Sequence, residues 1–161
     1  MLTKITGKII RAVKAVIYGP EGIGKGKKSI IGAMKRGTLT QNKVHLRDHE
    51  YKTVSILLEN GYDVELIPPS QIKGLRMPDI MMCGAPWEIK SPEGDGRNTV
   101  QNTMQNAAGQ ARNIIIDLRR CKMSEETAIK KFEQEFLKSK HVKKLKIIKK
   151  STLEILDFSK K

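Results

Sequence analysis

The chain has 161 residues and a formal net charge of +14 at pH 7, with 39% hydrophobic but only 4% aromatic residues. This length suits one domain whose core is built from aliphatic side chains. No apolar run approaches the ~20 residues that a membrane span requires, and the basic start lacks an apolar stretch followed by a cleavage site. We therefore expect a cytoplasmic protein without a membrane span.

The positive charge is concentrated at the two ends of the chain. The net charge of Lys, Arg, Asp and Glu is +8 over residues 1–50, −2 over 51–118 and +8 over 119–161. Basic surface attracts polyphosphates, because neutralising phosphates releases counterions. Nucleic acid is the expected partner; the alternatives are a protein that is merely basic and one that meets an anionic membrane surface.

Residues 1–43 form a basic segment rich in Gly and Lys. Within it, Val13–Tyr18 and the following Gly19–Lys25 resemble the strand and phosphate loop of P-loop NTPases, in which backbone N–H groups surround phosphates. The residue after Lys25 should be Ser or Thr to bind Mg²⁺, but it is Gly26. An NTPase is therefore a minor alternative. A flexible segment that contacts nucleic acid would also account for the Gly and Lys residues found here.

From residue 44 onward the pattern predicts a domain of alternating helices and strands. Apolar residues at helical spacing, with Gly61 as a stop signal, predict the first helix, and β-prone runs closed by Gly and Pro predict strands. The expected helices cover about 46–60, 98–112 and 124–139, and the expected strands cover 62–67, 78–83, 87–89, 113–118, 145–148 and 153–158. This order favours an α/β or α+β domain, 44–161, with a mixed central sheet flanked by helices.

The residues that suggest chemistry are Asp79 and the group Glu88, Ile89 and Lys90. Side chains alternate along a strand, so Glu88 and Lys90 share one face while Ile89 points to the core. If the hairpin turns near Cys83-Gly84, Asp79 lies directly across from Glu88. Trp87 then points to the opposite face, where core packing explains it better than base stacking.

Two carboxylates that converge on one face favour a divalent cation between them. Oxygen ligands suit Mg²⁺ or Mn²⁺, so Asp79 and Glu88 are the expected metal ligands. In phosphodiester hydrolysis a metal activates water, while a neighbouring lysine such as Lys90 positions the nucleophile or stabilises charge on the phosphate. The three residue types therefore match a metal-dependent nuclease.

Pro78-Asp79 followed by Glu88-Ile89-Lys90 resembles the signature of the PD-(D/E)xK nuclease superfamily, and the predicted element order resembles its restriction-endonuclease-like core. More narrowly, residues 87–92 and 110–117 look like the C-terminal tRNA nuclease domains of contact-dependent growth inhibition and related polymorphic toxins. The resemblance implies a toxin that a tight, acidic immunity protein neutralises. It also implies that Glu50, from the first helix, and Gln110 join the site.

Each of these residues also has a purely structural explanation. Glu88 and Lys90 could be solvent-facing strand residues, and Asp79 after Pro78 could be a turn residue. Glu50 could be an ordinary helix carboxylate, and Gln110 could bond the end of its helix. The sequence thus predicts an RNA-cleaving, most specifically tRNA-cleaving, enzyme, with a DNA endonuclease of the same fold or a non-catalytic nucleic-acid-binding module as alternatives.

Overall fold

The computed structural model describes residues 35–160 as three α-helices, one short 3₁₀ helix and seven strands. The helices are α1 (Asp48–Glu59), α2 (Thr99–Ala108) and α3 (Glu125–Lys138), with the 3₁₀ turn at Leu118–Arg120. The strands are β1 (Leu39–Thr40), β2 (Val64–Leu66), β3 (Ile80–Met82), β4 (Ala85–Lys90), β5 (Asn113–Asp117), β6 (Lys144–Ile148) and β7 (Ile155–Ser159).

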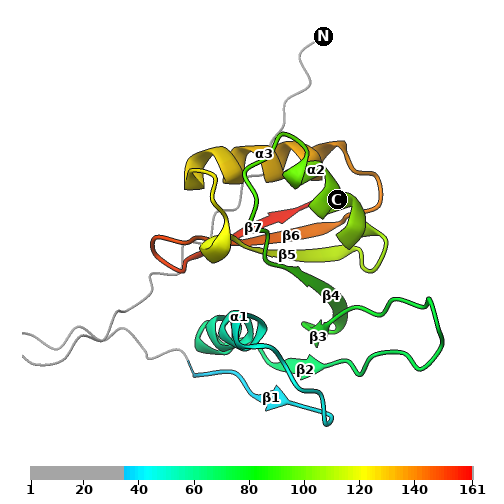
Figure 1. The fold of residues 1–161 in the computed structure, drawn as a ribbon. Coiled ribbons are helices and arrows are strands. Elements are labelled where there is room, and N and C mark those ends of the chain that lie inside the picture. The colour runs from blue at the N-terminus through cyan, green and yellow to red at the C-terminus, as the bar shows by residue number, and fades with distance from the viewer. Residues whose placement is uncertain (1–34, 161) are drawn as a thin grey trace, which may run out of the picture.

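The seven strands form one mixed sheet in which spatial order follows chain order from β1 to β7. Neighbours are parallel in the pairs β1–β2, β4–β5 and β5–β6, and antiparallel in β2–β3, β3–β4 and β6–β7. Each parallel pair from β4 to β6 is joined by a helical crossover, as parallel pairing requires. The expected class, a mixed sheet flanked by helices, is confirmed (Figure 1).

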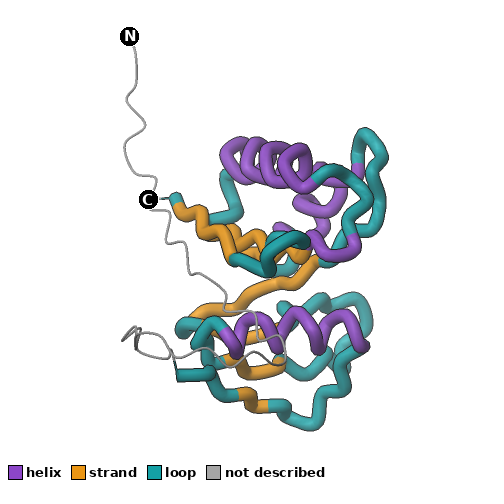
Figure 2. Tube along the Cα trace, turned by 90° about the vertical axis from the view of Figure 1, so that its left-hand side faces the viewer, coloured by secondary structure: helices purple, strands orange, loops and turns teal. Residues whose placement is uncertain are grey.

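The helices cover opposite faces of the sheet. On β5, Ile114 and Ile116 pack in a core with α2 and α3, whereas Ile115 packs in a second core with α1. Figure 2 shows the two helical layers on either side of the central strands. β5 is buried along its whole length, as the apolar run from Ile114 to Ile116 predicts for a central parallel strand.

Local sequence signals explain where several elements begin and end. Ser124 caps α3 as expected: its Oγ accepts a hydrogen bond from the backbone N–H of Thr127 at 3.3 Å. α1 ends at Glu59, and Gly61 follows with φ of 80°, the left-handed conformation that terminates many helices. Both signals are local, so the sequence alone locates these ends.

Other boundaries differ from the expectation. α2 ends at Ala108 rather than at residue 112, because Gly109 and Gln110 turn the chain so that Asn113 can enter β5. β4 begins at Ala85 rather than at residue 87, because a two-residue turn with positive φ at Cys83 and Gly84 closes the hairpin directly.

The short strand β1 was not expected. It lies within the predicted basic segment 1–43 and pairs with β2 through Leu39 and Thr40. The predicted phosphate-loop segment, residues 13–25, lies outside the described residues. Between residues 35 and 160, none of the helices has the length and apolar character needed to cross a membrane.

Candidate active site

The β3–β4 hairpin brings Asp79 opposite Glu88. The strands pair Ile80 with Trp87, and the same register continued by one residue sets Asp79 against Glu88. The Asp79 carboxylate is held in place because its Oδ2 accepts a hydrogen bond from the backbone N–H of Ile89 at 2.7 Å. Trp87 points to the other face and is 2% exposed in the α1 core, as the strand alternation predicted.

Glu88 is the centre of a polar cluster on the face that α2 and α3 cover. Its side chain is 2% exposed, and its Oε1 accepts hydrogen bonds from Lys90 Nζ and, at 2.5 Å, from Gln110 Nε2. Its Oε2 is buried and has no hydrogen-bond partner within the described part of the chain. A buried carboxylate oxygen without a partner is costly, so this atom is available for a ligand.

The electrostatics of the pair follow from this burial. Burial, opposed by the Lys90 hydrogen bond and reinforced by the nearby charge of Asp79, raises the pKa of Glu88 to about 7. The pKa of Asp79 is also raised, chiefly by partial desolvation of its carboxyl group, although the Ile89 N–H and Lys90 oppose the shift. The two carboxyl groups are thus close enough to influence each other's ionisation, as the hairpin prediction requires.

Glu50 lies at the third position of α1 and has two relations to its surroundings. Its Oε2 accepts a hydrogen bond from the backbone N–H of Arg47 at 2.9 Å, which stabilises the start of the helix. Its charge is also near enough to contribute to the raised pKa of Asp79. Glu50 is therefore beside the site, while its direct contact is structural.

The donor set fits a hard divalent cation. Asp79 and Glu88 offer carboxylate oxygens, one of them the unpartnered Glu88 Oε2, and a cation between them would remove the cost of two ionised neighbours. Within residues 35–160, no group of three or more His, Cys, Asp or Glu side chains is arranged to hold a metal. A bound Mg²⁺ would therefore keep several water or phosphate ligands, which is the usual coordination of this ion.

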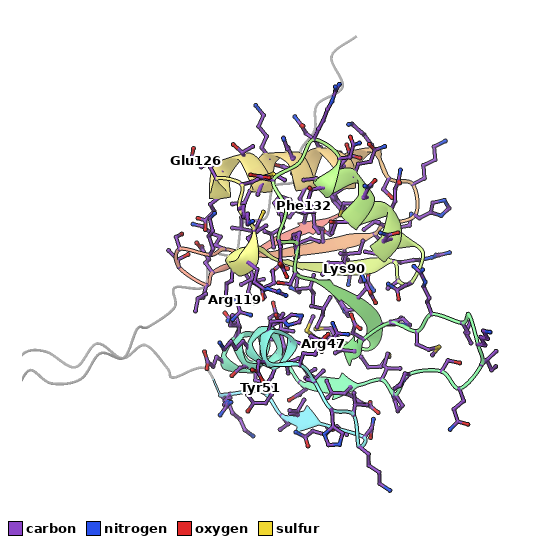
Figure 3. All side chains as sticks on the ribbon, in the orientation of Figure 1. Arg47, Tyr51, Lys90, Arg119, Glu126 and Phe132 are labelled. Carbon is purple, nitrogen blue, oxygen red and sulfur yellow. The ribbon has the colours of Figure 1, made fainter. Side chains whose placement is uncertain are left out.

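A second buried polar cluster was missed by sequence reasoning. Asp117, at the end of β5, is fully buried and accepts hydrogen bonds from Thr53 Oγ1 of α1 at 2.5 Å and from Arg119 Nε at 3.0 Å. Arg119 also donates to the backbone carbonyl of His49 at 3.3 Å. Figure 3 shows Arg119 beside α1.

This cluster ties α1, which carries Glu50, to β5. Because both Asp117 oxygens are already paired, we assign it a structural role. The signal that could have found it is an acidic residue at the end of an apolar buried strand, two positions before an arginine.

The chain is similar to known proteins in part of its sequence and in its fold. Residues 76–153 match the family model of the contact-dependent growth inhibition CdiA C-terminal domain. The fold is similar to that of a solved structure titled "CdiA-CT/CdiI toxin and immunity complex from Burkholderia pseudomallei", with a TM-score of 0.56 and 20% sequence identity, covering 77% of this chain and 100% of that chain. No curated protein matched the chain in sequence. Over residues 76–153, which carry most of the candidate site, the chain therefore matches the CdiA C-terminal domain family of contact-dependent growth inhibition.

Proposed function

We propose that this chain is a metal-dependent nuclease of the PD-(D/E)xK type, in which Asp79 and Glu88 hold Mg²⁺ or Mn²⁺ and Lys90 assists hydrolysis of a phosphodiester bond. The main support for the proposal is that the two carboxylate oxygens of Glu88 differ in their hydrogen bonding. Lys90 and Gln110 hold one carboxylate oxygen, while the other is buried and unpartnered in the described residues. Burial of an unpartnered carboxylate oxygen is costly, and a cation bound there would remove that cost.

The residues of the site have distinct tasks. Gln110 orients Glu88 by donating to Oε1, and the Ile89 N–H orients Asp79 in the same way. Lys90 is 28% exposed, so its ammonium group can reach a phosphate oxygen while still bonded to Glu88. A divalent ion held by Asp79 and Glu88 would supply positive charge and make a water molecule more acidic, which is the chemistry that phosphodiester hydrolysis requires. Glu50, whose charge acts on Asp79, is a further candidate for a carboxylate of this site.

We propose RNA, and tRNA in particular, as the substrate. The support is the net charge of +14, which suits a polyanion, and the resemblance of residues 87–92 and 110–117 to tRNA nuclease domains of polymorphic toxins. The toxin and immunity complex with a similar fold supports a toxin role and an immunity protein as the partner. The net charge of +14 suits an acidic partner. The site of action would be the cytosol of the cell that receives the toxin.

Two other functions would fit the same fold, and one experiment distinguishes them from an RNA nuclease. A DNA endonuclease of the same fold would use the same carboxylates, and a non-catalytic module would bind nucleic acid without cutting it. Incubation of the full chain with tRNA and with duplex DNA, each with Mg²⁺ or with EDTA, separates them. We expect tRNA fragments only with Mg²⁺; cleavage of DNA alone supports the endonuclease, and binding without cleavage supports the module.

Variants connect the activity to the site. We expect Asp79→Asn, Glu88→Gln and Lys90→Met each to reduce the cleavage rate by at least about 100-fold, the usual effect of removing a group that acts on the reacting atoms. Asp95→Asn and Lys73→Met are matched controls, since both side chains are exposed. Equal activity of site and control variants would refute the assignment.

A further inference from the structure

A cavity of about 350 Å³ lies beside Lys90 and belongs to neither the carboxylate pair nor the hydrophobic cores. Three separate parts of the chain form it: the loop between β2 and β3, the end of β4 with the residues that follow it, and α2. Its lining residues are Arg76, Lys90, Ser91, Pro92, Thr103 and Asn106. Its volume is at the lower end of the range of small-ligand pockets, which is large enough for one nucleotide unit.

The charges around this cavity favour an anion. Arg76 and Lys90 are the two charged residues among the six that line it, and both are cations. Lys90 already donates to Glu88, whereas Arg76 is exposed and forms no ion pair with a carboxylate among the described residues. A guanidinium group matches a phosphate through two parallel hydrogen bonds, so Arg76 is suited to a phosphate in this cavity.

The polar wall of the cavity contains an unsatisfied group. Ser91 Oγ is buried and has no hydrogen-bond partner within residues 35–160. Thr103 Oγ1 donates to the backbone carbonyl of Thr99 at 2.7 Å, which leaves its lone pairs to accept a further hydrogen bond. Asn106 lies three residues further along the same helix. Its side-chain amide has an NH2 group that can donate hydrogen bonds and an oxygen that can accept them. This set can bond the oxygens of a phosphate and an adjoining sugar.

We propose that this cavity is a substrate subsite that binds the phosphate group next to the one that is cleaved, with Arg76 pairing that phosphate and Ser91 donating its hydroxyl hydrogen to it. The inference rests on the proposed nuclease function, because Lys90 borders both the cavity and the carboxylate pair. The subsite sets the register of the strand: with the neighbouring phosphate held here, the next phosphodiester lies beside Asp79 and Glu88.

The test measures binding apart from cleavage. The full chain carrying Glu88→Gln is titrated in EDTA with a short labelled RNA oligonucleotide, with and without Arg76→Gln. We expect Arg76→Gln to weaken binding about five- to tenfold and to lower the salt-dependence slope by about one. Lys73→Gln is the matched control, since Lys73 is an exposed cation of the same loop that does not line the cavity.

A second measurement identifies the phosphate. Single phosphates of the oligonucleotide are replaced in turn by neutral methylphosphonates, and the affinity of each oligonucleotide is measured with and without Arg76→Gln. When the linkage next to the cleaved one is neutral, Arg76→Gln should cause no further loss of affinity, because the phosphate that Arg76 pairs has already lost its charge. Ser91→Ala should weaken binding while the melting temperature stays the same or rises, because it removes a buried hydroxyl without a partner.

The outcomes separate this proposal from the nuclease assignment. If the wild-type chain cleaves RNA but Arg76→Gln behaves like Lys73→Gln, or if no linkage shows coupling to Arg76, the subsite proposal is overturned and the nuclease proposal stands. If the chain neither binds nor cleaves any oligonucleotide, both are overturned. A loss of affinity in Ser91→Ala that accompanies a lower melting temperature would assign Ser91 to the fold instead.

Discussion

Replacing Glu88 by Gln should stabilise the metal-free protein at high pH. The Glu88 side chain is buried, and its pKa rises from an ordinary 4.5 in the unfolded chain to about 7 in the folded one. Below pH 4.5 the carboxyl group is protonated in both states, so it has no pH-dependent cost. Between about pH 4.5 and pH 7 the unfolded state has released this proton while the folded state keeps it, so stability falls across that window and levels off above pH 7, where the group is ionised in both states.

The magnitude follows from the shift. One pKa unit corresponds to about 1.4 kcal/mol, so a rise from 4.5 to about 7 corresponds to a cost of about 3 kcal/mol at pH 8. Glutamine has the shape of the protonated acid, and its carbonyl oxygen can still accept from Lys90 and Gln110. Its amide stays neutral at every pH. Glu88→Gln should therefore be more stable than wild type by about 3 kcal/mol at pH 8 and nearly equal to it at pH 4.

The assay is urea unfolding in EDTA at pH 4 and at pH 8, followed by circular dichroism, for wild type and Glu88→Gln. Glu126→Gln is the control, because Glu126 is an exposed carboxylate that Figure 3 shows at the start of α3. It should change stability by less than about 1 kcal/mol at either pH, the limit set by its interaction with the helix dipole. A stability difference between wild type and Glu88→Gln that is the same at both pH values would refute the reasoning. So would a variant that is less stable than wild type at pH 8.

Three further outcomes test the site and its support. Mg²⁺ should raise the melting temperature of wild type at pH 8 but not that of Asp79→Asn, since binding to the folded state alone stabilises it; an equal rise in both would show that the ion binds elsewhere. Arg119→Met should destabilise the fold by about 3 kcal/mol, because it leaves the fully buried carboxylate of Asp117 without its cation. The control Arg120→Met removes only an exposed ion pair and should cost less than about 1 kcal/mol. Equal effects in urea unfolding would contradict that assignment. Gln110→Leu should lower kcat for cleavage about tenfold with KM nearly unchanged, because Glu88 loses one orienting hydrogen bond. An unchanged kcat would leave Gln110 as a residue of the turn only.

Much of the architecture could be read from local patterns. Alternation along a strand separates Glu88 from Trp87, and the turn at Cys83-Gly84 sets the register that brings Asp79 opposite Glu88. The apolar run before Asp117 identifies a central buried strand. These features depend on short-range geometry, which residue type and spacing determine.

The packing of distant segments decided the rest. Nothing near Asp117 in the sequence indicates that Thr53 will bond to it across 64 positions, or that Arg119 will also reach the backbone of α1. The cavity beside Lys90 likewise exists only because α2 and the loop carrying Arg76 converge on the end of β4. Side chains that meet through tertiary packing have no common local signal.

The sequence by itself determined which residues can do chemistry and which of them share a strand face, because the two-residue period of a strand and the geometry of a tight turn are local properties. Only the tertiary structure decided the state of those residues. It buried Glu88 while exposing part of Lys90, and it brought Gln110 from the α2–β5 turn onto one oxygen of Glu88 while leaving the other without a described partner. Burial and hydrogen bonding depend on every segment that packs around a group, and the pKa of Glu88 follows from that whole environment.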